Sequence, residues 1–370
     1  CEQALKDIAE HYRRSLDIKV VGISGSVGKT STKEMIASVL SQKYNVLKTE
    51  GNFNNEIGLP LTVFNLREEH EVAVLEMGIS GFGEMTRLAR IARPDLCVIT
   101  NIGVAHIENL GSRDGILRAK TEMFAFMNPD GTIILNGDDD KLRGFTPDNG
   151  IQPVYFGLDP SCPYHAEQIR NMGLKGTTAE FVTPSERFEA HISIPGDHMV
   201  YNALAGIAAG QALGMTADEI RQGIEQLVPI AGRNHLIETD RYSIIDDCYN
   251  ANPVSMKSSL SVLSGADTRT VAILGDMFEL GNSEKEMHYE TGAFAADAGI
   301  NVLICIGGLS AETARGAREA SSGSDMEVLH YDTKEDFLNE AGQILHKNDT
   351  ILVKASHAMD FAKIVEELQK

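Results

Sequence analysis

The chain has 370 residues, of which 42% are hydrophobic and 23% are charged, which is typical of a folded globular protein. Its formal charge of -20 disfavours a nucleic-acid partner, because an acidic surface repels a phosphate backbone. Five widely spaced cysteines without a CxxC pair indicate neither a zinc site nor a disulfide framework, and they favour the reducing cytoplasm. No apolar run approaches the roughly 20 residues of a membrane span.

Residues 1–17 predict a charged amphipathic helix with Leu5, Ile8 and Tyr12 on one side. Over residues 19–136, short β-branched runs alternate with helical stretches, which predicts a parallel sheet covered by helices. The strands expected there are residues 20–23, 72–75, 96–99 and 132–135.

The segment 150–195 changes character, since Pro, Gly and Thr separate short alternating runs, and it predicts an antiparallel excursion. A helix is expected over 198–213. The segment 229–234 resembles a joint between domains, because a second series of strands and helices begins beyond it. The strands expected in that series are residues 243–245, 270–274, 302–306 and 350–353.

The predicted fold class is therefore α/β with two domains. A central phosphate-loop domain is expected over residues 18–233, and a smaller Rossmann-like, doubly wound domain over residues 234–370. The helix at 1–17 precedes both. Open sheets of this kind place ligands beyond the carboxyl ends of their strands.

The strongest motif follows the first expected strand and opens a helix. It reads Gly25-Ser26-Val27-Gly28-Lys29-Thr30-Ser31. Backbone N–H groups and the helix start bind phosphate oxygens, Lys29 neutralises them, and the Thr30 hydroxyl can reach magnesium. The first glycine stands three residues before Gly28 rather than five, so the motif departs from Walker A spacing. An incidental glycine turn is the alternative, which the flanking strand and helix disfavour.

Two further strand ends carry groups that suit a divalent cation, Glu76 and His106. Magnesium takes one or two protein ligands beside phosphate oxygens, so both residues are candidates on the same sheet edge. Histidine is an unusual magnesium ligand, and either residue alone is equally consistent with a solvated or structural role.

The segment 51–60 is rich in asparagine, with Asn52, Asn54 and Asn55. Their amides offer both donors and acceptors, which suits a polar sugar or peptide substrate. A set of Asx turns is the alternative interpretation.

In the second domain, residues 246–253 follow a strand and lead into a helix. Asp247 there is placed to accept from ribose hydroxyls, and Tyr249 to lie against a purine. The same pattern is consistent with a helix cap and turn. Arg233 at the joint is a candidate for binding phosphate.

Several segments, in one order from about Ala4 to the end of the chain, resemble the Mur ligases. The motifs that carry the resemblance are residues 24–30, 52–60, 76–78, 101–106, 119–122, 247–253, 274–277 and 279–281. The Tyr249-Asn250 form and the segment Gly275-Asp276-Met277 resemble the branch of the family that adds D-alanyl-D-alanine.

The resemblance implies an ATP-dependent amide-forming ligase that adds D-alanyl-D-alanine to a UDP-muramoyl tripeptide through an acyl phosphate, releasing ADP and phosphate. It implies a cytoplasmic enzyme of peptidoglycan synthesis, and hence of cell wall biogenesis, cell shape and cell division. ATP and two magnesium ions are the implied cofactors. We expect a monomer without nucleic-acid partners or membrane insertion.

The resemblance also implies roles for individual residues. The phosphate contacts are Gly25, Ser26, Gly28, Lys29, Thr30 and Ser31. The metal ligands are Thr30, Glu76, His106 and Lys120, where the family carbamylates the lysine. The other nucleotide contacts are Asn202, Arg233, Asp247, Tyr249, Asn250 and Asn252. Catalytic roles fall to Lys29, Lys120, His106 and Arg233, and the substrate candidates remain Asn52, Asn54 and Asn55.

The chain departs from the family pattern at three places. Met199 stands where the family usually has Asn, and residues 353–357 replace a Lys-Gly-Ser-Arg form, which leaves the role of His357 open. The chain also begins at what resembles the helix that joins the family's UDP-binding N-terminal domain to the next one. We therefore expect it to bind ATP but to ligate poorly.

Two alternatives stay open on the sequence alone. One is another acyl-phosphate ligase of the superfamily, of the folylpolyglutamate or cyanophycin type, which would use the same ATP site with a different amine. The other is a phosphate-loop ATPase module without ligation. The second nucleotide-facing motif in the 234–370 domain disfavours a simple ATPase.

Overall fold

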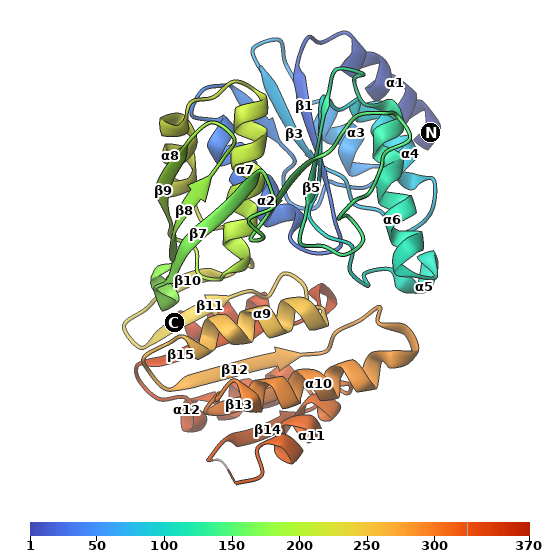
Figure 1. The fold of residues 1–370 in the computed structure, drawn as a ribbon. Helices are drawn as coiled ribbons and strands as arrows, with labels where there is room; N and C mark the ends of the chain where they lie inside the picture. Colours follow the sequence, from blue (N-terminus) through green and yellow to red (C-terminus); the bar gives the residue numbers. More distant parts are fainter. Residues whose placement is uncertain (324) are drawn as a thin grey trace. The chain divides into compact units, whose positions relative to one another are not determined.

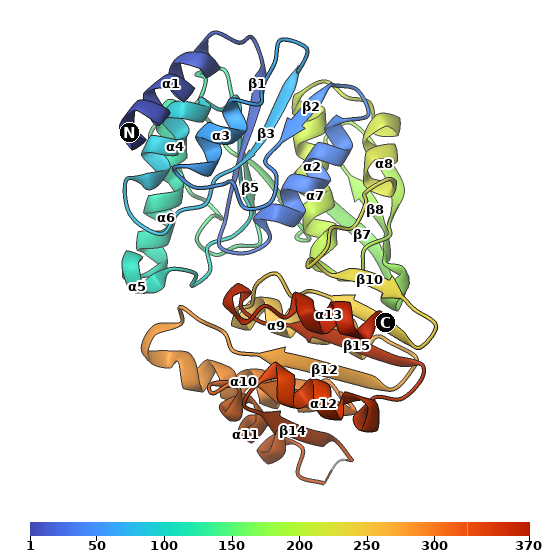
Figure 2. The same ribbon diagram turned by 180° about the vertical axis from the view of Figure 1, so that it is seen from behind.

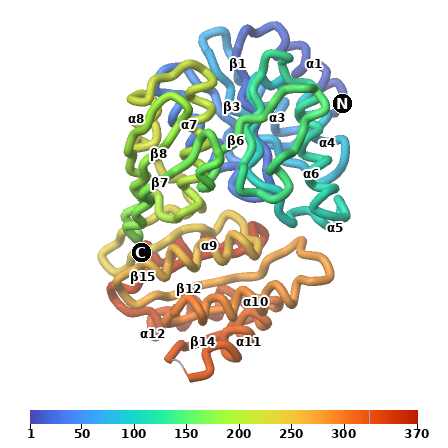
Figure 3. The backbone as a smooth tube through the Cα atoms, viewed as in Figure 1, coloured from blue at the N-terminus to red at the C-terminus, as the bar shows by residue number. Residues whose placement is uncertain are grey.

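The computed structural model describes every residue of the chain except Ser324, and the chain divides into two compact units. Unit 1 comprises Cys1–Arg170, Thr178–Ile192 and Asp197–Leu227, and unit 2 comprises Asn171–Thr177, Ser193–Gly196 and Val228–Lys370. The path of the chain can be followed by colour in Figure 3, from the blue amino terminus in unit 1 to the red end of unit 2. Each unit has its own β-sheet.

The sheet of unit 1 has nine strands among the described residues (Figure 1). In spatial order they are β2 (Val46–Lys48), β3 (Val72–Glu76), β1 (Lys19–Ser24), β4 (Leu96–Ile99), β5 (Thr132–Asn136), β6 (Val154–Gly157), β7 (Tyr164–Asn171), β8 (Thr177–Val182) and β9 (Arg187–Ile192). Each neighbouring pair from β2 to β7 is parallel. The four strands expected between residues 19 and 136 are confirmed as β1, β3, β4 and β5.

The register of the three central strands decides where functional groups can gather. Ile23 of β1 lies beside Glu76 of β3, and Ser24 lies beside Ile99 of β4. The three strands therefore end at the same edge of the sheet. The loops that follow them carry the phosphate-loop glycines and the other candidate groups to that edge.

The prediction of an antiparallel excursion over residues 150–195 was wrong at its start. β6 pairs in parallel with β5 through Ile134 and Val154, and β7 pairs in parallel with β6 through Phe156 and Tyr164. Alternation and turn residues identify strands but not their direction, so the parallel extension was missed. The helix expected next is confirmed as α7 (His198–Ala212).

Helices cover both faces of this sheet, as Figures 1 and 2 show from opposite sides. One layer contains α1 (Glu2–Arg14), α3 (Gly58–Val63), α4 (Glu84–Ala92) and α6 (Arg113–Thr121). The other contains α2 (Lys29–Leu40), α7 and α8 (Ala217–Glu225). Alternate strand residues pack against the first layer in one hydrophobic cluster, which includes Val20, Ala73, Cys97, Ile133, Leu88 and Ile116. Burial on both faces explains why these strands are almost continuously apolar.

Helix α1 packs through a face that includes two of the three predicted residues, since Tyr12 packs against the hydrophobic cluster and Leu5 is half-buried, but the face does not include Ile8. Its buried residues are Lys6, Ala9 and Arg13, whereas Ile8 is 59% exposed. Arg13 is accommodated because its guanidinium donates to three backbone carbonyls, those of Leu16, Ile18 and Ala92. The hydrophobic pattern placed Ile8 wrongly because two basic side chains with hydrogen-bond partners, Lys6 and Arg13, occupy buried positions that apolar residues would otherwise take.

Unit 2 contains a six-stranded sheet among its described residues. In spatial order its strands are β10 (His235–Glu238), β11 (Tyr242–Asp246), β15 (Asp349–Lys354), β12 (Thr270–Gly275), β13 (Val302–Ile306) and β14 (Glu327–Tyr331). The pair β10 and β11 is antiparallel and the other pairs are parallel. The four predicted strands are confirmed as β11, β12, β13 and β15.

Neighbouring residues of each strand in unit 2 face opposite hydrophobic clusters. Ile244 and Ile351 pack with α12 (Lys334–Ile344) and α13 (Ala362–Leu368) on one face. Ile245 and Leu352 pack on the other face with α9 (Pro253–Ser264), α10 (Glu284–Asp297) and α11 (Ser310–Ala320). This two-sided burial is the doubly wound arrangement that the sequence predicted.

Across the described residues, no helix has both the length and the apolar character that a membrane crossing requires.

Helices α10 and α11 approach so closely that a side chain would not fit between them. A Cβ on Gly292 would lie 1.8 Å from the Thr313 carbonyl oxygen. Overpacking of this kind costs about 1–3 kcal/mol, so we expect Gly292→Ala to lower the free energy of unfolding measured in urea.

Gly342→Ala in α12 is the matched control, because a Cβ there would meet nothing within 4 Å. We expect it to raise stability by up to about 1 kcal/mol through helix propensity. Equal effects of the two substitutions would contradict the close approach of α10 and α11.

Candidate active site

The loop after β1 has the backbone conformation of a phosphate cradle. Gly25 has a φ of 155° and Gly28, at the start of α2, has a φ of 83°, and both values favour glycine. A Cβ on Gly25 would lie 1.9 Å from Thr100 Oγ1. The loop therefore tolerates no side chain at Gly25, and its backbone amides lead directly into the amino terminus of α2.

The loop after β4 braces this cradle. Asn101 accepts from the Val27 N–H at 2.9 Å and donates to the Val27 carbonyl oxygen at 2.9 Å. Thr100 Oγ1 donates to the same carbonyl at 2.7 Å, and Ser26 Oγ accepts from the Gly103 N–H at 2.9 Å. Sequence reasoning noted Asn101 only as part of a motif and missed its bracing role. The available signal was that Asn101 follows shortly after β4, the strand that lies beside β1, which leads into the loop.

Two lysine amines converge on one backbone oxygen of the loop. Lys29 Nζ donates to the Gly25 carbonyl oxygen at 2.9 Å, and Lys120 Nζ donates to the same oxygen at 3.0 Å. Lys120 is only 2% exposed. Its burial, with repulsion from Lys29 as a smaller cause, lowers the pKa of Lys120 well below its ordinary value. Lys120 is thus a buried amine on α6 whose protonated form is disfavoured by its surroundings.

Glu76, at the end of β3, is a buried carboxylate with one oxygen unsatisfied. Oε1 accepts from Asn54 Nδ2 at 2.8 Å, and the Glu76 N–H donates to Thr49 Oγ1 at 3.0 Å. Oε2 has no hydrogen-bond partner among the described residues. A buried carboxylate oxygen without a donor is costly, and a hard cation such as Mg²⁺ would satisfy it. The residues present therefore fit a magnesium ion at this place.

The other candidate metal ligands lie in the loops and helices around that edge. His106 adopts a left-handed conformation, with a φ of 60°, at the start of α5 (Ile107–Leu110). Thr30 and Ser31 lie half-buried in the first turn of α2. In the described part of the chain, no three His, Cys, Asp or Glu side chains cluster as a metal-binding group. Any magnesium site would accordingly draw on few protein ligands, which is usual for this ion beside phosphates.

The three candidate asparagines have different roles in the structure. Asn54 supports Glu76, as described above. Asn55 Oδ1 accepts from the N–H groups of Ile57 and Gly58, at 3.1 and 2.8 Å, so it forms the Asx-type turn that was the alternative interpretation. Asn52 is exposed, and its carbonyl oxygen accepts from the Asn54 N–H.

Asn202, near the start of α7, lies against the helix that the phosphate loop opens. Its Oδ1 accepts from Thr32 Oγ1 at 2.8 Å, and its Nδ2 contacts the Met199 sulfur at 3.2 Å. Asn202 is 6% exposed, so its amide is largely committed to these neighbours. Met199, which replaces the Asn usual in the family, is one of them.

In unit 2, Asp247 is the centre of a separate polar cluster. Its Oδ1 accepts from the Asn234 N–H at 3.1 Å, and its Oδ2 accepts from Ser259 Oγ at 2.6 Å and from Lys354 Nζ at 2.5 Å. Lys354 also donates to the Asn250 carbonyl oxygen at 3.1 Å. Sequence reasoning missed Lys354 and Ser259, which fix the carboxylate in one orientation.

Tyr249 lies in the same cluster with a cation over its ring. The Arg233 guanidinium carbon is 4.1 Å from the ring centroid of Tyr249, and the His357 ring centroid is 5.2 Å away. Asn252 accepts from the Ser255 N–H at 2.9 Å and caps α9, as the alternative interpretation of this segment held. The structure thus groups Arg233, Asp247, Tyr249, Asn250 and Asn252 within unit 2.

Asn101 offers a direct test of the braced loop. We expect Asn101→Ala to weaken ADP binding roughly tenfold. Without Asn101 the loop is no longer held in order, and ordering it on binding costs about 1–2 kcal/mol of the binding free energy. Isothermal titration calorimetry measures the change.

Asn128→Ala is the control, because Asn128 bonds Asp95 at 3.2 Å next to the amino end of β4. It should leave ADP affinity unchanged. An equal loss in both variants would show that Asn101 has no special role at the loop.

Comparisons with known proteins identify the family of this chain. Residues 23–210 match the Mur ligase middle domain, and residues 232–357 match the Mur ligase, glutamate ligase domain. The UDP-N-acetylmuramoyl-tripeptide--D-alanyl-D-alanine ligase of Bacillus subtilis (strain 168) is 40% identical over 368 residues, which cover 99% of this chain and 79% of that protein.

Two solved structures are also similar over the whole of this chain. MurF from Acinetobacter baumannii matches with a TM-score of 0.90 and 30% identity, over 80% of that chain. MurF ligase from Thermotoga maritima, in complex with ADP, matches with a TM-score of 0.87 and 28% identity, over 83% of that chain. The chain therefore belongs to the Mur ligase family.

Proposed function

We propose that this protein joins D-alanyl-D-alanine to UDP-N-acetylmuramoyl-tripeptide with the consumption of ATP, as its Bacillus subtilis relative is named to do. The product is the amide-linked pentapeptide precursor of peptidoglycan. The reaction has two steps, and each needs reactants held in line rather than new chemistry from the protein.

In the first step, a carboxylate oxygen of the tripeptide attacks the γ-phosphorus of ATP. The bond from that phosphorus to the bridging oxygen breaks, and ADP leaves with its electron pair. In the second step, the amine of D-alanyl-D-alanine attacks the acyl carbon. The C–O bond to phosphate breaks, an amide forms, and the amine proton is lost.

The observation that carries the proposal is the charge arrangement at the carboxyl edge of the central strands. Two lysine amines, of Lys29 and Lys120, reach the Gly25 carbonyl oxygen, and Glu76 on the adjoining strand keeps Oε2 unsatisfied. Phosphoryl transfer requires fixed positive charge beside the phosphates, which Lys29 is proposed to supply, together with a carboxylate for their metal ion, which Glu76 is proposed to supply.

Each part of this edge has a proposed task. The amides of Gly25, Ser26 and Gly28 bind the nucleotide phosphates, and Lys29 exchanges its bond to the loop carbonyl for a phosphate oxygen. Thr30, Ser31, Glu76 and His106 form the metal and phosphate surroundings at the start of α2. Magnesium, when bound there, supplies neutralisation of charge on the transferring phosphoryl group.

Lys120 is proposed to carry a carbamate. Burial lowers the pKa of Lys120, which favours the unprotonated amine, and the lone pair of that form can attack the carbon of CO₂. A C–O π pair then moves to oxygen, and one proton leaves the nitrogen. The remaining N–H can keep its bond to the Gly25 carbonyl oxygen, while the new carboxylate offers oxygens to a second magnesium ion.

In unit 2, the cluster around Asp247 is proposed to bind a nucleotide. Asp247 is held by Lys354 and Ser259 and is suited to accept from a ribose hydroxyl. Arg233 supplies fixed positive charge for phosphate. Asn202 in unit 1 is proposed to contact the adenine, for which its amide would exchange its present contacts with Thr32 and Met199.

Among the asparagines, Asn52 is the proposed substrate contact, because it is exposed. Asn54 acts through Glu76 instead, and Asn55 shapes the turn.

We further propose that the protein is a cytoplasmic monomer. Cell fractionation and analytical ultracentrifugation test these two assignments.

The function is tested by the substrate dependence of ADP release. We expect slow but continuous release only when UDP-N-acetylmuramoyl-tripeptide and D-alanyl-D-alanine are both present, with the pentapeptide product seen by mass spectrometry. Replacing the dipeptide by glutamate is the control and should abolish turnover.

Other outcomes would favour the alternatives. Stimulation by folate and glutamate would indicate a folylpolyglutamate-type ligase. Release at full rate without either substrate would indicate an ATPase module.

The carbamate has its own measurement. With ¹³C-labelled bicarbonate, we expect a carbamate carbon signal in the NMR spectrum of the protein that is absent from Lys120→Met. Lys33→Met is the control and should retain the signal, because Lys33 is equally buried but pairs with Glu34 at 3.0 Å. Absence of the signal from the protein without substitutions would rule out the carbamate.

A further inference from the structure

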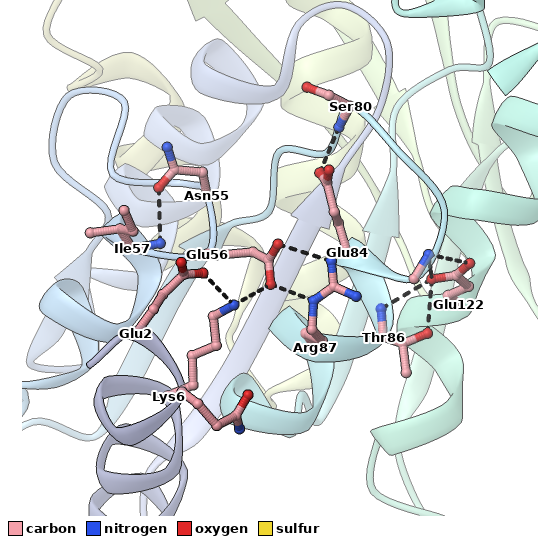
Figure 4. A network of polar contacts seen from close by, with 12 residues as sticks. Glu2, Lys6, Asn55, Glu56, Ile57, Ser80, Glu84, Thr86, Arg87 and Glu122 are labelled. Atoms are coloured by element: carbon pink, nitrogen blue, oxygen red, sulfur yellow. Dashed lines mark hydrogen bonds and ion pairs between the residues drawn. The ribbon is translucent and has the colours of Figure 1, made fainter. Parts of the chain in front are cut away.

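One carboxylate in unit 1 links three elements that are distant in sequence. Glu56 lies in the loop before α3 and accepts from Lys6 Nζ on α1 at 2.6 Å. It also accepts hydrogen bonds from both Nε and Nη2 of Arg87 on α4, the latter at 2.9 Å. Figure 4 shows Glu56 between these two cations. We call this group of three side chains, Lys6, Glu56 and Arg87, the Glu56 clamp.

The clamp is more than an ordinary surface ion pair. The side chains of Lys6 and Glu56 are 11% and 22% exposed, and the contact with Arg87 is bidentate. The Arg87 hydrogen bonds, followed by the one from Lys6, lower the pKa of Glu56 to about 2. The carboxylate is therefore ionised throughout the neutral range, with its orientation fixed by two cations.

The loop that Glu56 anchors is the one that supports the candidate metal carboxylate. Asn54, two residues earlier, donates from Nδ2 to Glu76 Oε1 at 2.8 Å, and its carbonyl oxygen accepts from the Gly78 N–H at 2.9 Å. Asn55, between them, holds the start of α3. A shift of Glu56 would therefore be transmitted through two residues to the support of Glu76.

Helix α4, which provides Arg87, is itself fixed beside the active-site lysine. Glu122, two residues after Lys120, accepts from the N–H groups of Gly83 and Thr86 and from Thr86 Oγ1, at 2.8 to 3.1 Å. Figure 4 shows these bonds at the start of the helix. The amino end of α4 is thus tied to the segment that carries Lys120. Through Arg87, the same helix is tied to the loop that carries Asn54, Asn55 and Glu56, which we call the asparagine loop.

We propose that Glu56 is a positioning residue for the ligase reaction, because the clamp holds Asn54 against Glu76 and so keeps the Glu76 carboxylate ready for a divalent cation. This inference rests on the proposed function, since it assumes that Glu76 binds the metal. It assigns to α1 a part in the active site, although α1 contributes no residue to the phosphate loop.

The test compares two carboxylates that both tie α1 to α4. Glu56→Gln removes the charge of the clamp and retains its shape. Glu10→Gln is the matched control, because Glu10 pairs with Arg90 of α4 at 2.7 Å, is 12% exposed and lies outside the asparagine loop. Mn²⁺ binding in the presence of ADP, measured by electron paramagnetic resonance, reports on the metal site without requiring turnover.

We expect Glu56→Gln to weaken Mn²⁺ binding about 3- to 10-fold, a smaller change than direct loss of a ligand's hydrogen-bond partner produces. Glu10→Gln should leave Mn²⁺ binding unchanged, even if both variants lose similar thermal stability. In the steady state, Glu56→Gln should lower kcat at limiting magnesium, and kcat should recover at high magnesium. The KM for D-alanyl-D-alanine should be unaffected.

A double-mutant cycle separates positioning from general loosening. If Glu56 acts through Asn54, adding Glu56→Gln to Asn54→Ala should weaken Mn²⁺ binding no further. Additive losses would overturn the inference, as would unchanged Mn²⁺ binding in Glu56→Gln alone. If the unsubstituted protein with ADP binds no Mn²⁺ at all, the proposed metal site fails instead, and the two failures are thereby distinguished.

Discussion

The carbonyl oxygen of Gly25 is the point on which the active-site edge of unit 1 depends. It accepts hydrogen bonds from both Lys29 and Lys120, and it does so because Gly25 adopts a conformation closed to side chains, against Thr100. Two amines that would repel each other are brought together on one acceptor. Burial, and to a smaller extent repulsion from Lys29, then lowers the pKa of Lys120 well below its ordinary value.

Much of this arrangement could be predicted from the sequence, because it depends on short-range pattern. The strand before Gly25, the helix after it and the polar residues at the ends of β3 and β4 all follow from β-branched runs and glycine spacing. Parallel strands that end together then bring Glu76 and the loop to one edge, as expected.

What could not be predicted is which distant side chains pair. Lys354 lies 107 residues from Asp247, and no local pattern links a lysine at the end of one strand to a carboxylate after another. The burial of Lys120 could not be predicted either, because helix periodicity does not reveal which face a neighbouring loop covers. Ile8 misled in the opposite way, since an apolar residue on α1 stays exposed while Arg13 is buried on backbone carbonyls.

The saturation of Asp247 limits what it can recognise. Its carboxylate accepts at least three hydrogen bonds from the described residues, two of them on Oδ2, and a carboxylate has about four acceptor positions in all. At most one position therefore remains, on Oδ1. A vicinal diol could donate at most one of its two hydroxyls there, so this residue is suited to distinguish the orientation of a sugar ring rather than to bind both hydroxyls.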